Sequence, residues 1–195
     1  MPDQDHFVLW TPNLILRNFL PSDLSDYLAM NRDAKYQRFY SEEDCSDEKA
    51  ASLVDLFIQQ AQQNPRTAYQ LAITEKTSHR FVGTCGIRRE GNNASMGCGL
   101  VRGFHGTGYA KEASHALMAF GFETLGVSRV YAETIGENRS AIALCRQLGL
   151  VEEARIKDAR YFKHQWWDSV RLSIDAQTWR KNVAIRERAN MPNQP

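Results

Sequence analysis

One glycine-rich stretch, residues 101–113, constrains the fold of this chain more than any other part of its sequence. The stretch is V-R-G-F-H-G-T-G-Y-A-K-E-A, with three glycines within six residues. An apolar run over residues 96–100 precedes it, and apolar residues at helical spacing follow it over residues 110–124. The sequence therefore predicts a strand, a tight loop and a helix in direct succession.

A loop of this kind, placed directly before a helix, favours an anionic ligand. Gly106 and Gly108 allow a tight turn and the close approach of a ligand to the main chain. The helix that begins near Gly108 directs its free N–H groups and the positive end of its dipole toward the same point. A phosphate or pyrophosphate is the commonest ligand there, although simple packing is the alternative for any glycine-rich turn.

The glycine spacing argues against two common nucleotide-binding motifs. A dinucleotide fingerprint requires G-x-G-x-x-G between a strand and a helix, whereas this loop has G-x-x-G-x-G. A P-loop requires G-K followed by Ser or Thr, and the sequence lacks that combination. Both nucleotide-binding interpretations are therefore weakened.

The same loop resembles the pyrophosphate loop of the GNAT acyltransferases, which is [Q/R]-x-x-G-x-[G/A] followed by a helix. In the branch that includes the ribosomal-protein alanine N-acetyltransferases, an aromatic residue is followed by G-K-G-Y-A-x-E-A. Gly103 stands where the motif has Gln or Arg, with Arg102 one place earlier, and His105 stands where Trp is common. The matching positions are Gly106, Gly108, Tyr109, Ala110, Glu112 and Ala113.

A second stretch strengthens the resemblance. Residues 138–150 are close to the GNAT signature N-x-x-A-x-x-L-Y-x-x-x-G-F, with Cys145 at the Tyr position and Leu150 at the Phe position. Residues 14–23 also resemble the L-x-L-R-x-x-x-x-x-D opening of this branch. The resemblance spans residues 14–174 and implies a GNAT-like acyl-CoA N-acyltransferase fold. That fold is mixed α/β, with a central, mostly antiparallel twisted sheet and helices on both faces.

The pattern of the whole chain predicts one domain of this class. The fourth and fifth strands are expected to be parallel, because a helix connects them. We place the domain at residues 1–175 and a C-terminal tail at residues 176–195, as a loosely held helix or a disordered end. Strands are expected at 14–20, 69–74, 81–88, 95–101, 129–135, 151–162 and 166–174, and helices at 24–31, 46–60, 108–125 and 138–148.

Composition limits the partners and the compartment. The net charge of +1 creates no overall field that would favour nucleic acid or an acidic membrane surface. The sequence has no run of about 18 apolar residues, and its first six residues lack a signal-peptide pattern, so we expect a cytoplasmic protein. The four cysteines and five histidines are scattered without metal-ligand spacing, so we expect free thiols and no metal.

For acetyl-CoA, the resemblance implies two main contacts. The pyrophosphate lies on the amides of residues 105–110, and the pantetheine arm follows the strand edge at residues 97–101, where that strand separates from the next. Gly97 and Gly99 fit a close backbone approach, although a β-bulge explains them equally well. Asn138, implied to contact the CoA arm, also suits a helix N-cap. The predicted cofactor-binding residues are Leu100, Val101, Arg102, His105, Gly106, Thr107, Gly108, Tyr109, Ala110 and Asn138.

Glu133 is the predicted general base. It lies in a strand five residues before Asn138, where the resemblance implies the base of the GNAT enzymes that acetylate ribosomal-protein N-termini. A half-buried carboxylate tends to have a raised pKa, which suits a base near neutral pH. An ion pair on an exposed strand edge is the alternative. The fourth strand, where many GNAT enzymes carry a Glu, has Ser95 and Met96 instead.

Cys145 is the predicted proton donor to the leaving thiolate, in place of the tyrosine of the family. A thiol has an ordinary pKa of about 8.5 and can donate a proton. Cys145 also lies on the apolar side of its predicted helix, where a small core residue is the alternative. Ser140 and water are the other candidate donors.

Together these features predict an N-acetyltransferase that moves an acetyl group from acetyl-CoA to a primary amine. The acceptor is a protein or peptide N-terminus or a small amine such as a polyamine, an amino acid or an amino sugar, and a homodimer is allowed. Glu42, Glu43 and Asp44 would attract a cationic acceptor, unless they form a solvated loop before the next helix. The alternative function is a non-catalytic acyl-CoA sensor or interaction module, which the missing tyrosine at position 145 favours.

Overall fold

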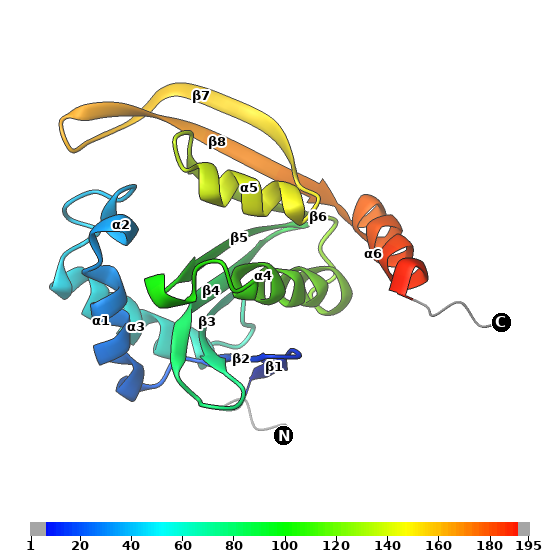
Figure 1. The fold of residues 1–195 in the computed structure, drawn as a ribbon, viewed down its shortest axis with the longest axis horizontal. Coiled ribbons are helices and arrows are strands. Elements are labelled where there is room, and N and C mark those ends of the chain that lie inside the picture. Colours follow the sequence, from blue (N-terminus) through cyan, green and yellow to red (C-terminus); the bar gives the residue numbers. More distant parts are fainter. Residues whose placement is uncertain (1–6, 191–195) are drawn as a thin grey trace.

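An open sheet of eight strands forms the centre of the computed structural model, which describes residues 7–190 and the side chains of residues 7–185. The strand order is β1-β2-β3-β4-β5-β6-β8-β7, and every neighbouring pair is antiparallel except β5 and β6 (Figure 1). The strands are β1 (Val8–Trp10), β2 (Leu14–Asn18), β3 (Ala68–Glu75), β4 (Phe81–Glu90), β5 (Asn93–Leu100), β6 (Arg129–Ile135), β7 (Val151–Phe162) and β8 (Gln165–Asp175). The helices are α1 (Leu24–Asn31), α2 (Ala34–Gln37), α3 (Asp47–Ala61), α4 (Tyr109–Ala119), α5 (Arg139–Gln147) and α6 (Ala176–Asn190).

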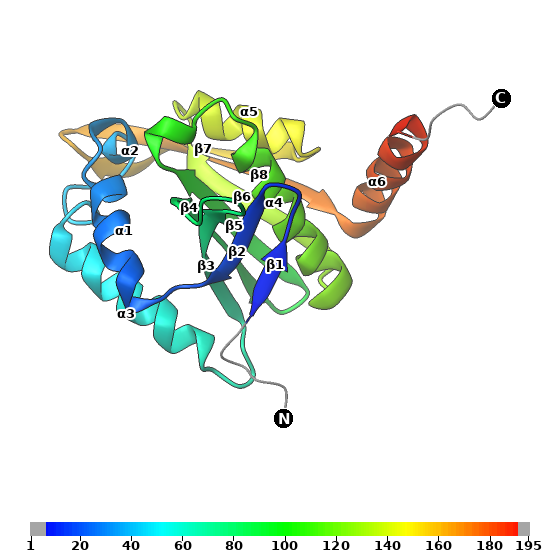
Figure 2. The same cartoon turned by 60° about the horizontal axis from the view of Figure 1, so that its bottom comes forward.

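Helices cover both faces of the sheet because its central strands are apolar on both faces. In β3, Leu71 and Ile73 belong to the larger core, which α4 and α5 cover, whereas Ala72 faces the smaller core beneath α1 and α3. Figure 2 shows α1 and α3 on one side of the sheet and α4 and α5 on the other. The predicted α/β class, the mostly antiparallel sheet and the parallel pair made by the fourth and fifth predicted strands are confirmed.

The first turn of α4 is bound to the β1–β2 connection by Glu112. Its carboxylate accepts hydrogen bonds from the Thr11 hydroxyl at 2.6 Å and from the backbone and side-chain amides of Asn13 at 2.7 and 2.9 Å. Burial acts to raise the pKa of Glu112, but the hydrogen bonds from Asn13 and Thr11 outweigh it and lower the pKa. The glutamate of the glycine-loop motif therefore positions α4 on the sheet.

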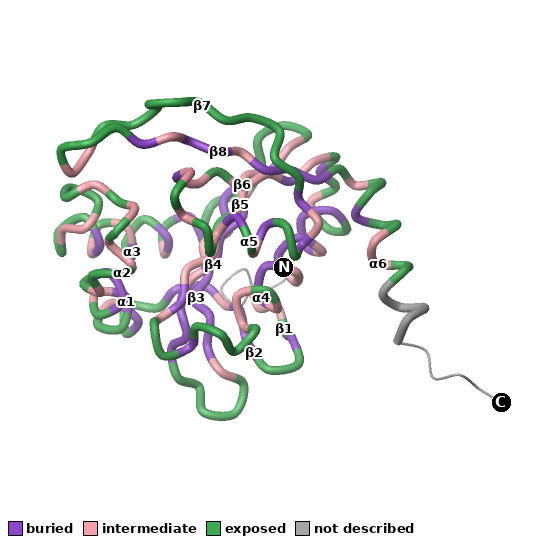
Figure 3. The backbone as a smooth tube through the Cα atoms, turned by 45° about the horizontal axis from the view of Figure 1, so that its top comes forward, coloured by how far each residue is buried: buried purple, intermediate pink, exposed green. Residues whose placement is uncertain are grey.

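The β7–β8 hairpin arches over α5 and reaches toward α2 (Figure 1). The residues of β7 are exposed almost throughout, whereas residues 167–174 of β8 are buried or half-buried (Figure 3). At the tip, Lys163 and His164 have positive φ angles of 51° and 59°, as the favoured two-residue hairpin turn requires.

The tip of the hairpin contacts the end of α2. The Lys163 ammonium donates to the Gln37 carbonyl at 2.6 Å, and the ring of Trp167 lies 6.0 Å from that of Phe39 in an edge-to-face arrangement. Aromatic pairs of this geometry contribute stability beyond the apolar area they bury. Two segments far apart in the sequence are thereby joined on one side of the molecule.

The C-terminal helix α6 packs against α4 and the segment that follows α4, chiefly through Trp179. Trp179 is only 1% exposed, stacks on Phe122 at 5.6 Å and contacts the His115 ring at 4.6 Å. Of the two alternatives predicted for the tail, residues 176–190 adopt the helical one, and residues 191–195 lie outside the described part. No helix within residues 7–190 is both long and apolar enough to cross a membrane.

Two short elements and one side chain depart from the pattern-based expectations. The sequence does not predict β1 or α2, since elements of three and four residues are too short to show a period. The spacing of apolar residues in the sequence predicts Leu53, Leu56, Phe57 and Gln60 on the apolar side of α3; Phe57 and Gln60 are buried there, whereas Leu56 is 40% exposed.

We predict that Trp179→Ala lowers the free energy of unfolding by about 3–5 kcal/mol, because it removes a fully buried indole and leaves a cavity. Arg180→Ala, at the exposed neighbouring position, is the control and should change it by less than about 0.5 kcal/mol. Chemical denaturation followed by circular dichroism measures both. A loss below about 1 kcal/mol for Trp179→Ala would mean that α6 does not depend on this contact.

Candidate active site

The strands β5 and β6 separate after a short contact, and the gap between them defines the candidate site. Their parallel pairing covers three consecutive residue pairs and ends at Ser95 and Tyr131. β5 nevertheless continues to Leu100 and β6 to Ile135. Both strands keep antiparallel partners on their other edges, so the gap lies within a well-formed sheet.

The free edge of β5 presents main-chain groups to this gap. The N–H of Val101 donates to the Val82 carbonyl of β4 at 2.9 Å, and successive residues of a strand direct these groups to opposite edges. The amides of Cys98 and Leu100 therefore face the gap, where β6 no longer pairs with them. An extended ligand with amide groups can bind such an edge as an added strand would.

The glycine loop leads from this edge to α4 and has the geometry of an anion site. Gly106 and Gly108 have φ angles of 82° and 88°, in the left-handed region, and Gly108 is the N-cap residue of α4. A Cβ atom at either glycine would meet no atom within 4 Å. Glycine is therefore required at these two positions by the left-handed main-chain conformation and not by a lack of space. In the first turn, the N–H groups of Ala110 and Lys111 have no partner within the helix.

The other side chains of the loop stabilise its conformation. Arg102 donates to Asp33, the N-cap residue of α2, at 3.0 Å, and a ring nitrogen of His105 lies 3.1 Å from the Leu100 carbonyl. The Thr107 hydroxyl donates to the Phe104 carbonyl at 2.7 Å, and the Tyr109 hydroxyl to Glu75 at 3.2 Å. The amide of His105 donates to the Arg102 carbonyl, so the free amides of the loop begin after it.

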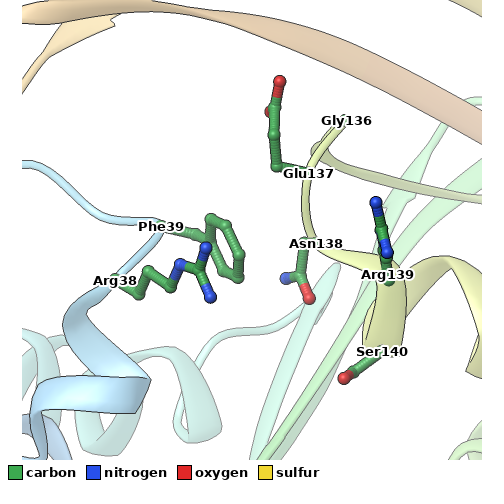
Figure 4. Close-up of a pocket in the computed structure, with 7 residues that line it drawn as sticks. All are labelled: Arg38, Phe39, Gly136, Glu137, Asn138, Arg139 and Ser140. Atoms are coloured by element: carbon green, nitrogen blue, oxygen red, sulfur yellow. The ribbon is translucent and has the colours of Figure 1, made fainter.

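Asn138 caps α5 beside the gap. Its side-chain oxygen accepts from the Ala141 amide and its side-chain nitrogen donates to the Thr134 hydroxyl, both at 3.2 Å. A cavity of about 560 Å³ separates this helix start from the end of α2, and the Arg38 guanidinium points across it toward Asn138 (Figure 4). The cavity is lined by Arg38, Phe39, Gly136, Glu137, Asn138, Arg139 and Ser140.

Glu133, on β6, is held by two arginines of the hairpin. Arg171, directly opposite in β8, donates from Nε and Nη2 to Oε2 at 3.3 and 3.0 Å, and Arg160 of β7 donates to Oε1 at 3.3 Å. Burial acts to raise the pKa of Glu133, but hydrogen bonds from Arg171 and Ser169 and the charges of both arginines outweigh it. The pKa of Glu133 is therefore lowered, and the expected raised value is wrong, because the ion pair considered as the alternative is present.

A second cavity, of about 410 Å³, adjoins Glu133 between the hairpin and the segment that follows α2. Of the predicted acidic trio, only Asp44 lines it, and its carboxylate accepts a hydrogen bond from the Ser41 hydroxyl at 2.8 Å. Glu42 and Glu43 are exposed beside it. The lining residues are Phe39, Tyr40, Ser41, Asp44, Glu133, Thr134, Ile135, Asn138, Arg160, Tyr161, Phe162 and Ser169.

The glycines of β5 make room on the same face of the sheet as Glu133. A Cβ atom on Gly99 would lie 3.0 Å from the ring of Tyr36 in α2, whereas one on Gly97 would meet nothing within 4 Å. The register between β4 and β5 runs without a shift, so the β-bulge alternative is wrong. Burial, with the neighbouring Tyr40, raises the pKa of Tyr36 far above its ordinary value, and the hydroxyl remains protonated.

Cys145 lies in the larger core at 7% exposure. Burial raises the pKa of its thiol to about 11, so the thiol is protonated at neutral pH. It does not line either of the two cavities described above, whereas Ser140, the alternative donor, lines the larger one. The role of Cys145 as proton donor remains a prediction.

The arginines around Glu133 are not predicted from the sequence. Arg171 lies 38 residues away and becomes its neighbour through the register of β6 and β8. Arg160 reaches it from β7, the strand beyond β8. The acidic cluster of Glu42, Glu43 and Asp44 can be recognised in the sequence because its residues are consecutive. A single arginine within a predicted strand does not indicate its partner until the register of the strands is known.

The sequence profile of the Acetyltransferase (GNAT) domain matches residues 13–151. This range covers more than half of the chain and includes the glycine loop, Glu133, Asn138 and Cys145.

Two N-acetyltransferases described as uncharacterised are similar to this chain. The p20 protein of Bacillus licheniformis is 31% identical over 110 residues, which cover 55% of this chain and 62% of that protein, so the match spans less than two thirds of its length. YoaA of Bacillus subtilis (strain 168) is 24% identical over 171 residues, which cover 86% of this chain and 96% of YoaA.

Among solved structures, the chain is similar to RimL, a ribosomal L7/L12 alpha-N-protein acetyltransferase, in complex with coenzyme A. The TM-score is 0.75 at 19% identity, over 87% of this chain and 98% of RimL. At this level of identity the likeness concerns the fold.

The ion pairs of Glu133 predict a measurable titration. We expect Arg171→Gln to raise the pKa of the Glu133 carboxyl toward its ordinary value of about 4.3. The substitution removes the hydrogen bonds from Arg171, which are the largest of the contributions that lower this pKa against the effect of burial. Carbon-detected NMR titration measures this, with the Glu133 signal identified by its loss in Glu133→Gln. Arg155→Gln is the control, because Arg155 pairs with Glu152 and Asp168 instead.

The lowered pKa of Glu133 also determines how the stability of the fold changes with pH. A carboxyl whose pKa is lowered by folding stabilises the fold above its unfolded pKa and loses this contribution as pH falls through the folded pKa. Wild-type protein should therefore lose more stability than Arg171→Gln on acidification below about pH 4. An unchanged Glu133 pKa in Arg171→Gln would contradict this assignment.

Proposed function

The chain belongs to the GNAT acetyltransferase family, and from that premise we propose that it transfers the acetyl group of acetyl-CoA to a primary amine with Glu133 as general base. The observation that supports this best is the placement of Glu133 beside the gap between β5 and β6, next to a cavity that Asn138 also lines. In this proposal the thioester enters the gap from the glycine loop and the amine approaches from the cavity. Direct attack then requires that these two reactants are held in contact.

The residues of the gap fit coenzyme A by their chemistry. We place the pyrophosphate on the loop amides from Gly106 to Lys111 other than that of Tyr109, which donates to the Thr107 hydroxyl at 3.3 Å. The left-handed glycines keep side chains away from this position. The pantetheine arm has amide groups, which match the unpaired edge of β5 at Cys98 and Leu100. Acetyl-CoA supplies the activated acyl group, and the chain supplies its orientation.

Glu133 is suited to accept a proton although its pKa is lowered. A carboxylate with a lowered pKa is ionised at neutral pH, so it is in the form that can accept a proton from the nitrogen of the amine as it attacks, directly or through water. Arg171 keeps the carboxylate oriented toward the cavity edge through two hydrogen bonds. The lowered pKa makes Glu133 a weaker base, but the N–H of the amine becomes much more acidic as the C–N bond forms, so the proton can pass to a carboxylate at that stage.

The leaving thiolate has two protein donors in this proposal. Ser140 lines the cavity beside Asn138, and Cys145 lies five residues further along α5, inside the core. The position of Ser140 favours it, or water near it, over the buried Cys145. A non-catalytic acyl-CoA-binding module remains the second candidate function, favoured by the doubly paired state of Glu133 and by the burial of Cys145.

Thiol release from acetyl-CoA, measured with a panel of amines, tests the proposal. We expect Glu133→Gln to lower kcat by roughly 100-fold at neutral pH, the usual contribution of a general base. The affinity for acetyl-CoA, measured by calorimetry, should be unchanged. The defect should shrink as pH rises, because more of the amine then arrives neutral.

Glu153→Gln provides the matched control. Glu153 also pairs with an arginine, Arg129, but lines neither cavity, so its variant should retain normal turnover. A normal rate in Glu133→Gln near pH 7 would show that Glu133 is structural. Binding of acetyl-CoA without thiol release for any amine would support the binding module instead.

A further inference from the structure

Glu133 has one more cationic partner than its charge requires. Arg171, on the strand directly opposite, donates two N–H groups to Oε2 and supplies one positive charge for the one negative charge of the carboxylate. Arg160 adds a single hydrogen bond of 3.3 Å, and 61% of its side chain is exposed. A guanidinium has five N–H donors, so most donors of Arg160 have no partner within the described side chains.

The position of Arg160 places these free donors at the second cavity. Arg160 lies on β7 opposite Trp167 and lines the cavity next to Tyr161 and Phe162. The ammonium of the nearby Lys163 is already bound to the Gln37 carbonyl. Arg160 is thus the cation of the hairpin that is available to a ligand in this cavity.

The lining of the cavity carries both signs of charge, which suits a zwitterion. Asp44 and Glu133 line it with carboxylates and Arg160 lines it with a guanidinium, while Arg171 pairs with Glu133 from outside the lining. A polyamine would bring a second ammonium into a cavity that already contains Arg160, and like charges close together are unfavourable. An acceptor with one ammonium and one carboxylate would instead find a partner of opposite charge for each group.

We propose that Arg160 binds a carboxylate of the acceptor, so that the preferred substrate of the proposed acetyl transfer is an amine with a carboxylate a few bonds away. A free amino acid and a peptide with an acidic residue next to its N-terminus both have this chemistry. The volume of about 410 Å³ accommodates an acceptor of either kind at its amine end. Binding of the carboxylate draws Arg160 toward the acceptor and leaves Glu133 with Arg171.

Two pairs of amines that differ in one carboxylate test this specificity. Alanine and alaninamide represent a free amino acid, and the amides of alanyl-glutamate and alanyl-glutamine represent a peptide N-terminus. Thiol release gives kcat/KM for each amine. Calorimetry with protein saturated with CoA gives amine binding without turnover.

In wild-type protein we expect the carboxylate-bearing member of at least one pair to be preferred. Arg160→Gln should reduce that preference about tenfold or more, the worth of one charged hydrogen-bonded contact, and Arg160→Glu should reverse it. The KM for acetyl-CoA should not change in either variant. Arg146→Gln, an exposed arginine of α5 that pairs with Glu152, is the matched control and should keep the wild-type preference.

The outcomes separate this assignment from the proposed function. If Arg160→Gln lowered kcat/KM equally for both amines of each pair, Arg160 would serve only Glu133. This result would overturn the assignment of Arg160 but not the proposed acetyl transfer, because turnover would still be observed. Absence of turnover, together with carboxylate binding that Arg160→Gln abolishes, would preserve recognition by Arg160 and overturn the catalytic proposal. Absence of both turnover and Arg160-dependent binding would overturn the two together.

Discussion

The parallel pairing of β5 and β6 ends at Ser95 and Tyr131, and the positions of the other functional groups depend on this short contact. Had the pairing continued to Leu100, the main-chain groups of β5 would have been occupied by β6 and no edge would face the glycine loop. The antiparallel partners on either side, β4 and β8, keep the two separating strands in place. The gap is therefore a stable feature of the fold, and its unpaired amides are compensated only when a ligand or water binds them.

Electrostatics on the hairpin side of the gap gives the site its chemical character. The pKa of Glu133 is lowered because hydrogen bonds from Arg171 and Ser169 and the charges of Arg171 and Arg160 outweigh the effect of burial, so the role we propose for it as a base does not depend on desolvation. The hairpin also contributes Lys163, whose contact with Gln37 brings α2 and the hairpin tip together around the second cavity. One element thus supplies both the arginine partners of Glu133, the base we propose, and a wall of the second cavity.

Much of the fold could be predicted from the sequence, because long periodic segments and glycine-marked turns report local structure directly. The α4 and α5 helices and the loop before α4 are examples, and Asn138 is an N-cap as its position in the pattern suggested. The charge environment of Glu133 could not be predicted, since it depends on Arg171 and Arg160 reaching it through strand register over long sequence separations. The acidic residues Glu42, Glu43 and Asp44 show the same limit. The sequence shows that they are consecutive, but the course of the loop decides that Asp44 lines the cavity and the other two do not.

Residue-resolved amide hydrogen exchange, with and without coenzyme A, tests most directly whether the gap holds the cofactor. The account predicts that coenzyme A slows exchange at Cys98 and Leu100, whose amides face the unpaired edge, and at Gly106 to Lys111 in the loop. The amides of Gly97 and Gly99, directed toward β4, should exchange at nearly the same rate in both states. Protection confined to other parts of the chain, with Cys98 and Leu100 unaffected, would contradict the claim that the separation of β5 and β6 is the cofactor site.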